Sequence, residues 1–257
     1  MKTQLRNIIN FSLKKELAYR QHQPLPILFD HLPKCAGTTI IQYLLTQYPR
    51  RVSYVTDGRK PSESAKKFKS FSAKSRHGYH LVVGHCTHQL LDYVHPDSIK
   101  LTIFRDPVER IISHYFFVRE NKRHYLHQKI IKSNLSLEDY ATSELSCELR
   151  NFYVSHFSDL LVSQINQNPQ QSIERAVKVV LERYDVIGFQ DDLTSTMNKL
   201  QNLAHLSEPF ADRIFNKTQK KAVEKISAST KKAIAQANSL DVELYNRLKT
   251  HKAEVVS

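Results

Sequence analysis

The chain has 257 residues, with 38 lysines and arginines against 25 aspartates and glutamates, which gives a formal net charge of +13. With 40% hydrophobic and 25% charged residues it can bury a core, so an intrinsically disordered chain and a disulfide-stapled miniprotein are both excluded. Its three cysteines never stand in C-x-x-C spacing, which indicates a reducing compartment and argues against a cysteine-rich zinc site.

The N-terminal segment, residues 1–23, is predicted to be a basic amphipathic helix. It either docks on the body of the protein or attaches to an anionic membrane surface. No apolar run approaches 18 residues and no secretory signal is evident, so we expect a cytoplasmic protein, with peripheral membrane contact through residues 1–23 as the alternative. Residues 24–257 are expected to form a single domain.

Short apolar runs alternate with helical patterns along the rest of the chain. The runs read as buried strands and lie at 27–29, 81–83, 99–104 and 186–189. Such alternation predicts an α/β fold with a mainly parallel sheet flanked by helices. The basic, serine-rich residues 57–78 interrupt the pattern and are interpreted as a surface excursion that could cover a site.

The five glycines exclude the usual signatures of three enzyme classes. Even the closest pair, Gly78 and Gly84, is too far apart for G-x-G-x-x-G, G-x-x-x-x-G-K-[ST] or G-x-S-x-G. This spacing leaves the chain without a dinucleotide fingerprint, a Walker loop or a nucleophile elbow.

A strand, loop and helix over 27–45 form the first candidate site. The strand is followed by Pro33, Lys34, Cys35, Ala36, Gly37, Thr38 and Thr39, and then by an apolar helix face. Such a turn aims backbone N–H groups and the positive end of a helix at one point, where a phosphate binds well. Gly37 would let the backbone approach closely, and Lys34 adds a full charge. The alternative is a plain connection with a solvated lysine.

The second candidate site follows the run at 99–104. Asp106 as N-cap, with Pro107 and Glu109 in the first turn, predicts the start of a helix. Arg105 stands at the carboxyl end of the strand, where open α/β sheets bind ligands, and Ser113 lies two turns into the helix. The pair could hold a second phosphate. In the alternative, Arg105 pairs with Asp106 or Glu109 and Ser113 only fills a polar position.

Together, P-K-C-A-G-T-T and F-R-D-P-V-E-R-I-I-S-H-Y resemble the carbohydrate sulfotransferases that include the heparan sulfate and chondroitin enzymes. Three further stretches agree in order, at 84–85, 184–188 and 238–245. The resemblance implies a fold similar to the P-loop nucleotide kinases and the donor 3′-phosphoadenosine 5′-phosphosulfate (PAPS), with 3′,5′-ADP as product. It implies that residues 33–39 hold the 5′-phosphosulfate, and that Arg105 and Ser113 hold the 3′-phosphate.

One stretch departs from the family pattern. Many members carry N-x-Q-T-R-x-L-S-G, whereas residues 151–159 read NFYVSHFSD, with Tyr153 where the pattern has glutamine. The role that the family gives to the missing arginine is therefore not carried over, and acceptor recognition is left open.

Transfer of a sulfuryl group to a hydroxyl needs a base and stabilisation of the leaving phosphate. His85 is the candidate base, because it follows a strand and Gly84 leaves room for a substrate beside it. The dipeptide Gly84-His85 also resembles the one in heparan sulfate 2-O-sulfotransferases, in which the histidine acts as the base. Lys34 is expected near the bridging oxygen. Glu109 or a histidine from 114–127 is the reserve. No metal is expected, since the H-x-x-H pairs at 85–88 and 124–127 lack a third ligand of evident spacing.

The sequence thus predicts an enzyme that moves the sulfuryl group of PAPS to a hydroxyl of a saccharide, anionic or neutral. A nucleotide-dependent kinase is one alternative, disfavoured by the missing second glycine of the Walker loop. The other is a non-enzymatic basic module that binds nucleic acid or an acidic polymer, which the charge of +13 suggests. We expect no nucleic acid partner, because a basic surface serves an anionic donor and acceptor equally well.

Overall fold

The computed structural model describes residues 13–210 and 226–256. These residues form two compact units, the first made of 13–103 with 183–210 and the second of 104–182 with 226–256. The expectation that residues 24–257 form a single domain remains a prediction.

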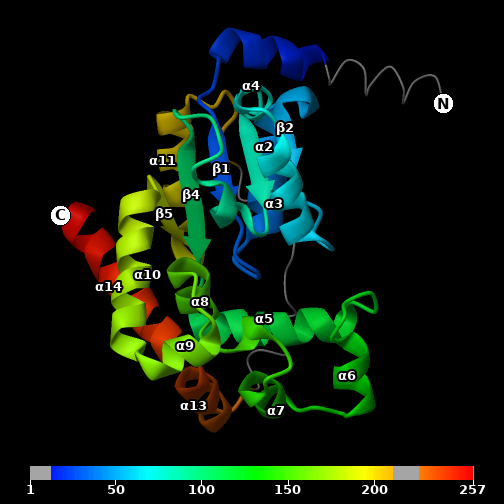
Figure 1. The fold of residues 1–257 in the computed structure, drawn as a ribbon, viewed down its shortest axis with the longest axis vertical. Coiled ribbons are helices and arrows are strands. Elements are labelled where there is room, and N and C mark those ends of the chain that lie inside the picture. Colours follow the sequence, from blue (N-terminus) through cyan, green and yellow to red (C-terminus); the bar gives the residue numbers. More distant parts are fainter. Residues whose placement is uncertain (1–12, 211–225, 257) are drawn as a thin grey trace. The chain divides into compact units, whose positions relative to one another are not determined.

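The first unit is built on a five-stranded sheet in the order β2-β3-β1-β4-β5 (Figure 1). The pairs β1–β3, β1–β4 and β2–β3 are parallel, so the carboxyl ends of these strands lie at one edge of the sheet. This arrangement confirms the predicted α/β fold class. The strands are β1 (Ile27–Asp30), β2 (Ser53–Val55), β3 (Leu81–Gly84), β4 (Ile99–Phe104) and β5 (Val186–Phe189).

Helices in the first unit pack on this sheet. α2 contacts β3, α11 contacts β5, and α3 contacts the short turn η2 that follows β3. The elements are α2 (Gly37–Gln47), α3 (Pro61–Ser70), α4 (Ala73–His77) and α11 (Leu193–Ala204), with the 3-10 turns η1 (Arg50–Val52), η2 (Thr87–Leu90) and η4 (Gln190–Asp192).

The basic segment 57–78 is more ordered than the sequence predicted. It contains α3 and α4, and Ala65 and Phe68 of α3 are buried because they stand three residues apart on one helix face. Lys66 and Lys67 of α3 are exposed. The expected excursion is therefore a pair of short helices rather than an irregular loop.

The second unit is helical. An apolar cluster forms where α5 meets α6, α7 and α13, and it includes Ile111, Ile112 and Tyr115 from one face of α5. Asp106 caps α5 by accepting the backbone N–H of Glu109, as expected. The elements are α5 (Pro107–Glu120), α6 (His127–Lys132), α7 (Leu137–Thr142), η3 (Cys147–Leu149), α8 (Phe152–Ser158), α9 (Val162–Gln167), α10 (Pro169–Arg183, its last residue in the first unit), α13 (Ala228–Ala237) and α14 (Ser239–Val256).

The described part of the N-terminal segment is helical over residues 13–22, while the positions before residue 13 lie outside the described residues. This helix docks through polar side chains: Lys15 Nζ donates to the Leu45 carbonyl at 2.9 Å, and Tyr19 Oη lies 2.6 Å from His80 Nδ1. Its apolar side chains Leu13 and Leu17 are 55% and 64% exposed. Membrane attachment of the segment remains a prediction.

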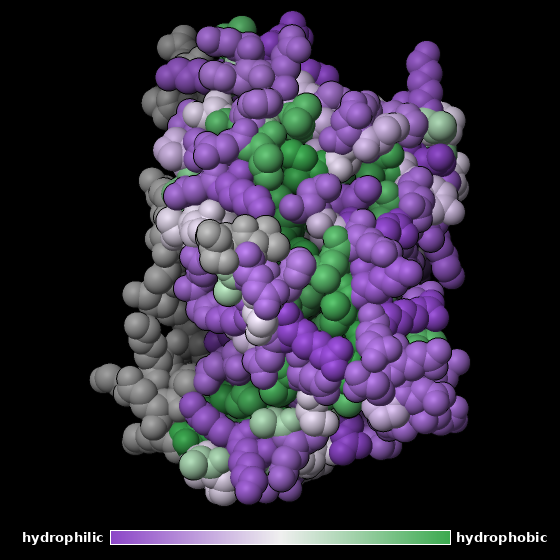
Figure 2. Space-filling view, turned by 90° about the vertical axis from the view of Figure 1, so that its left-hand side faces the viewer, coloured by the Kyte–Doolittle hydropathy of each residue, from purple (hydrophilic) through white to green (hydrophobic). Residues whose placement is uncertain are grey.

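Figure 2 shows one face of the molecule, on which hydrophilic side chains predominate and apolar areas lie between them. Within residues 13–210 and 226–256, no helix is both long and apolar enough to cross a membrane.

Candidate active site

The loop after β1 forms a backbone cradle. Lys34 and Ala36 are left-handed, with φ of 66° and 60°, and α2 begins directly afterwards at Gly37 without a side-chain cap. Left-handed residues among right-handed ones turn neighbouring N–H groups toward one side of the chain, and the helix N-terminus adds its positive dipole. Non-glycine residues with positive φ are strained, and such strain clusters at ligand-binding sites. The loop is thus suited to an anion.

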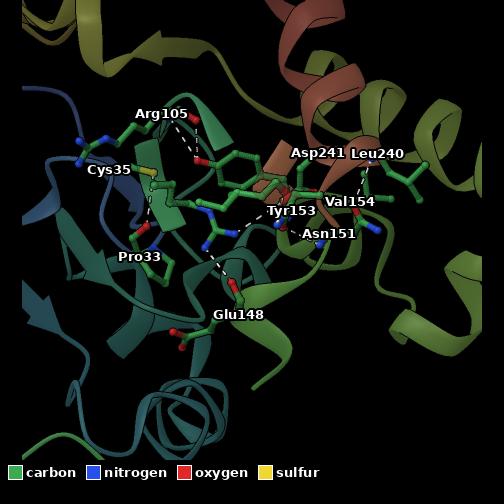
Figure 3. A network of polar contacts seen from close by, with 12 residues as sticks. Pro33, Cys35, Arg105, Glu148, Asn151, Tyr153, Val154, Leu240 and Asp241 are labelled. Carbon is green, nitrogen blue, oxygen red and sulfur yellow. Dashed lines mark hydrogen bonds and ion pairs between the residues drawn. The ribbon is translucent and has the colours of Figure 1, made fainter. Parts of the chain in front are cut away.

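Side chains of the loop divide into exposed and buried groups. Thr38 is exposed and Lys34 is half-buried, whereas Thr39 and Cys35 are buried. Cys35 turns inward: its N–H donates to the Leu32 carbonyl at 3.3 Å, and its thiol donates to the Pro33 carbonyl at 3.5 Å (Figure 3). Cys35 therefore closes the loop on itself, while Lys34 and Thr38 carry the accessible polar groups.

Gly37 is needed for a different reason from the one the sequence suggested. A Cβ at this position would lie 1.8 Å from Cδ2 and Nε2 of His31. The imidazole of His31 thus occupies the space beside Gly37, so the missing side chain serves internal packing rather than only the approach of a ligand.

His31 and His85 form a stacked pair at the carboxyl ends of β1 and β3. Their ring centroids lie 4.2 Å apart with planes inclined by 22°, and His85 Nδ1 lies 2.8 Å from the His31 carbonyl oxygen. Because a carbonyl oxygen only accepts hydrogen bonds, Nδ1 of His85 carries the proton and Nε2 is the basic nitrogen of the neutral ring. Burial, and secondarily the charge of His85, lower the pKa of His31 well below its usual value. His31 is therefore neutral at physiological pH.

Gly84 and Thr56 fix the backbone next to this pair. Gly84 has a φ of +128°, and a Cβ there would lie 2.1 Å from Oγ1 of Thr56. The same hydroxyl donates to the His85 carbonyl at 3.1 Å. The space beside Gly84, expected to admit substrate, is thus filled by Thr56, which holds His85 in place. Thr56 follows β2, a strand that the sequence analysis did not predict.

Asp30, at the end of β1, is a further polar centre that the sequence analysis missed. It is fully buried, accepts a hydrogen bond from Tyr184 Oη at 2.8 Å, and accepts others from Thr87 Oγ1 at 3.3 Å and the His88 N–H at 3.2 Å. Burial, and then the charge of Asp30, raise the pKa of Tyr184 well above its ordinary value. Asp30 therefore joins the loop after β3 to the turn before β5. An aspartate ending an otherwise apolar strand was the available signal.

Arg105 and Ser113 belong to the second unit. The Arg105 side chain is 19% exposed, and its Nη2 lies 4.0 Å from Oε2 of Glu109, a long ion pair of the kind that the alternative interpretation expected. Ser113 is 3% exposed on α5. The backbone of Arg105 is bound by the hydroxyl of Tyr153, another residue that the sequence analysis did not select (Figure 3).

Two of the reserve histidines, His114 and His127, are buried. His114 is buried, with Nε2 2.9 Å from Oε2 of Glu148 and Nδ1 2.7 Å from the Tyr140 hydroxyl. His127 is also buried, and its Nδ1 donates to a backbone carbonyl at 2.9 Å. His85 is partly exposed, and its bond to the His31 carbonyl defines Nε2 as its basic nitrogen, so it remains the candidate base.

A family model described as the sulfotransferase family matches residues 19–247, which cover both candidate loops and the histidine pair. The chain belongs to the sulfotransferase family. The match confirms the predicted enzyme class, sulfuryl transfer, and agrees with the α/β sheet. No curated protein is significantly similar to the chain. The finer resemblance to heparan sulfate and chondroitin enzymes remains a prediction for this sulfotransferase.

Proposed function

We propose that this sulfotransferase moves the sulfuryl group of PAPS to a hydroxyl of a saccharide. The observation that carries the proposal is the pairing, in one unit, of the backbone cradle at 33–39 with His85, whose basic nitrogen is defined by its bond to His31. The cradle is assigned to the donor's 5′-phosphosulfate, and Arg105 with Ser113 to its 3′-phosphate. Family membership supports both assignments.

The residues divide the chemistry between them. Nε2 of His85 takes the proton of the acceptor hydroxyl while its oxygen forms a bond to sulfur. The bond from sulfur to the bridging oxygen breaks, and 3′,5′-ADP leaves with the electron pair. Lys34 and the N–H groups at the start of α2 stabilise the negative charge that grows on the departing phosphate. Neither role requires a metal ion.

Donor recognition is tested by thermal unfolding with three nucleotides. We expect 3′,5′-ADP to stabilise the protein far more than 5′-AMP or ATP at equal concentration, because only 3′,5′-ADP carries both phosphates in the assigned positions. A ligand at a hundredfold excess over its dissociation constant stabilises by about 2.7 kcal/mol. Equal shifts from ATP and 3′,5′-ADP would contradict the proposal.

Arginine variants provide the internal control. Arg105→Ala should lower the affinity for 3′,5′-ADP and leave that for 5′-AMP nearly unchanged. Arg150→Ala removes another arginine of the second unit, which pairs with Glu144 at 3.3 Å, and should change neither affinity.

Charge beside the histidine pair supports an anionic acceptor. α3 packs against η2, the turn that starts two residues after His85, and Ser62 Oγ lies 3.7 Å from Sγ of Cys86. The exposed Lys66 and Lys67 of this helix therefore stand on an element that borders the His85 loop. Positive charge there raises the local concentration of an acidic saccharide.

Reversing these two charges tests the acceptor class. Lys66→Glu with Lys67→Glu should raise the KM for an acidic saccharide several-fold at low salt and flatten its salt dependence, since exposed charges are screened over about 8–10 Å. The control, Lys14→Glu with Lys199→Glu, changes the net charge equally on two other helices and should leave that KM unchanged. An unchanged KM in the α3 variant would show that its lysines are only solvated.

A further inference from the structure

Tyr153 binds both backbone polar groups of Arg105. The Arg105 N–H donates to the tyrosine oxygen at 3.2 Å, and the tyrosine hydroxyl donates to the Arg105 carbonyl at 2.9 Å (Figure 3). Arg105 is the turn residue between β4 and the cap of α5. Because a hydroxyl donates and accepts at once, this one side chain fixes the turn from which the guanidinium of Arg105 extends.

Tyr153 is itself held from several sides. Its ring is fully buried, lies edge-on to Phe104 with centroids 5.1 Å apart, and has the guanidinium of Arg110 5.1 Å from its centroid. Its N–H donates to Asp241 at 3.0 Å, as does the N–H of Val154. A side chain fixed at both its backbone and its ring loses little entropy when its hydroxyl binds a partner.

The start of α8 depends on the C-terminal stretch 238–245. The Asn151 N–H donates to Asn238 Oδ1 at 3.1 Å, and the Leu240 N–H donates to Asn151 Oδ1 at 3.2 Å. Burial raises the pKa of Asp241 to about 6, against the opposing effects of Arg110 and the backbone N–H groups. Asn238 and Asp241 thus place the start of α8 and Tyr153, although nearly 90 residues separate them from it in sequence.

We propose that Tyr153 is a positioning residue, whose hydroxyl sets the direction in which Arg105 meets the 3′-phosphate of the donor. The proposal rests on the proposed function for the role of Arg105. Hydrogen bonds from a guanidinium to a phosphate weaken steeply with misalignment, so a loosened turn costs affinity for that phosphate alone. The proposal also gives a role to the stretch 151–159, in which Tyr153 stands where the family pattern has glutamine.

Tyr153→Phe removes the hydroxyl and keeps the ring. In calorimetric titrations of the full chain, we expect the affinity for 3′,5′-ADP to fall about 5- to 20-fold, which corresponds to a hydrogen bond of ordinary net strength. The affinity for 5′-AMP should change less than twofold. The KM for the donor should rise more than kcat falls, because the base and the acceptor are untouched.

Tyr115→Phe is the matched control. Tyr115 is a buried tyrosine of the same unit whose hydroxyl also donates and accepts, to the Leu135 carbonyl at 2.8 Å and from Arg119 at 3.1 Å. Tyr115→Phe should lower the melting temperature about as much as Tyr153→Phe does. It should leave the affinities for 3′,5′-ADP and 5′-AMP unchanged. A structural role alone would make the two variants equivalent, and that result would overturn the proposal.

If Tyr153→Phe does not fold, amide hydrogen exchange tests the hydrogen bonds between Tyr153 and the Arg105 backbone in the unaltered protein. The Arg105 N–H should exchange at least tenfold more slowly with 3′,5′-ADP bound than with 5′-AMP bound, and equal exchange would overturn the proposal. A wild type that binds the two nucleotides equally would overturn the proposed function and this inference with it. A preference for 3′,5′-ADP that survives Tyr153→Phe would overturn the inference alone.

Discussion

Replacing His85 by alanine should lower the rate of sulfuryl transfer by about 10²- to 10⁴-fold, the usual contribution of a positioned base. Binding of 3′,5′-ADP should change little, since the backbone cradle and Arg105 are left in place. His85→Asn should be as inactive, although its amide can still donate to the His31 carbonyl as Nδ1 of His85 does. Steady-state rates and titrations of both variants measure the two effects separately.

His80 provides the control for this experiment. It stands just before β3, at the opposite end of the strand from His85, and its Nδ1 lies 2.6 Å from the Tyr19 hydroxyl. His80→Ala should loosen the helix at residues 13–22 and keep the wild-type rate. If His85→Ala retained more than about a tenth of the wild-type rate on the true acceptor, the base would have to be another residue.

Gly84→Ala should destabilise the protein by at least about 2 kcal/mol, because it combines strain at a positive φ with overpacking. The new Cβ would lie 2.1 Å from Oγ1 of Thr56, and a φ of +128° is unfavourable for any residue with a side chain. Urea unfolding measures the loss. Since Thr56 binds the His85 carbonyl, Gly84→Ala should also lose activity at urea concentrations at which it is still folded.

Two variants separate the causes of this loss. Adding Thr56→Ala to Gly84→Ala should restore part of the stability, because it removes the clash with the side chain but leaves the backbone strain. Gly58→Ala, where a Cβ meets nothing within 4 Å, should change stability by less than about 1 kcal/mol in either direction. A Gly84→Ala protein as stable as wild type would show that the local packing differs from that described.

The sequence by itself determined the elements whose signals are local. Apolar runs marked β1, β3, β4 and β5, since buried parallel strands are continuously apolar. The first turn of α5 followed from Asp106, Pro107 and Glu109, because capping depends on residues three positions apart. The two motif stretches resembled the carbohydrate sulfotransferases, and the match over residues 19–247 established the sulfotransferase family.

Weak local signals account for what was missed in the fold. β2 has three residues, all half-buried or exposed, so no apolar run marks it. In α3, the charged and serine residues concealed the helical spacing of Ala65 and Phe68. Both elements are stabilised by the neighbours on which they pack rather than by their own composition.

Only the tertiary structure decided which residues support the candidate site. His31 and His85 are 54 residues apart in sequence, and Arg105 and Tyr153 are 48 apart. No periodicity links such pairs, because they meet only when strands and helices pack together. For the same reason Gly37 and Gly84 were predicted to be open to a ligand, whereas folding places His31 beside the first and Thr56 beside the second. The sequence thus supplied the chemical groups, and packing between distant segments determined their orientation, their burial and which of them carries a proton.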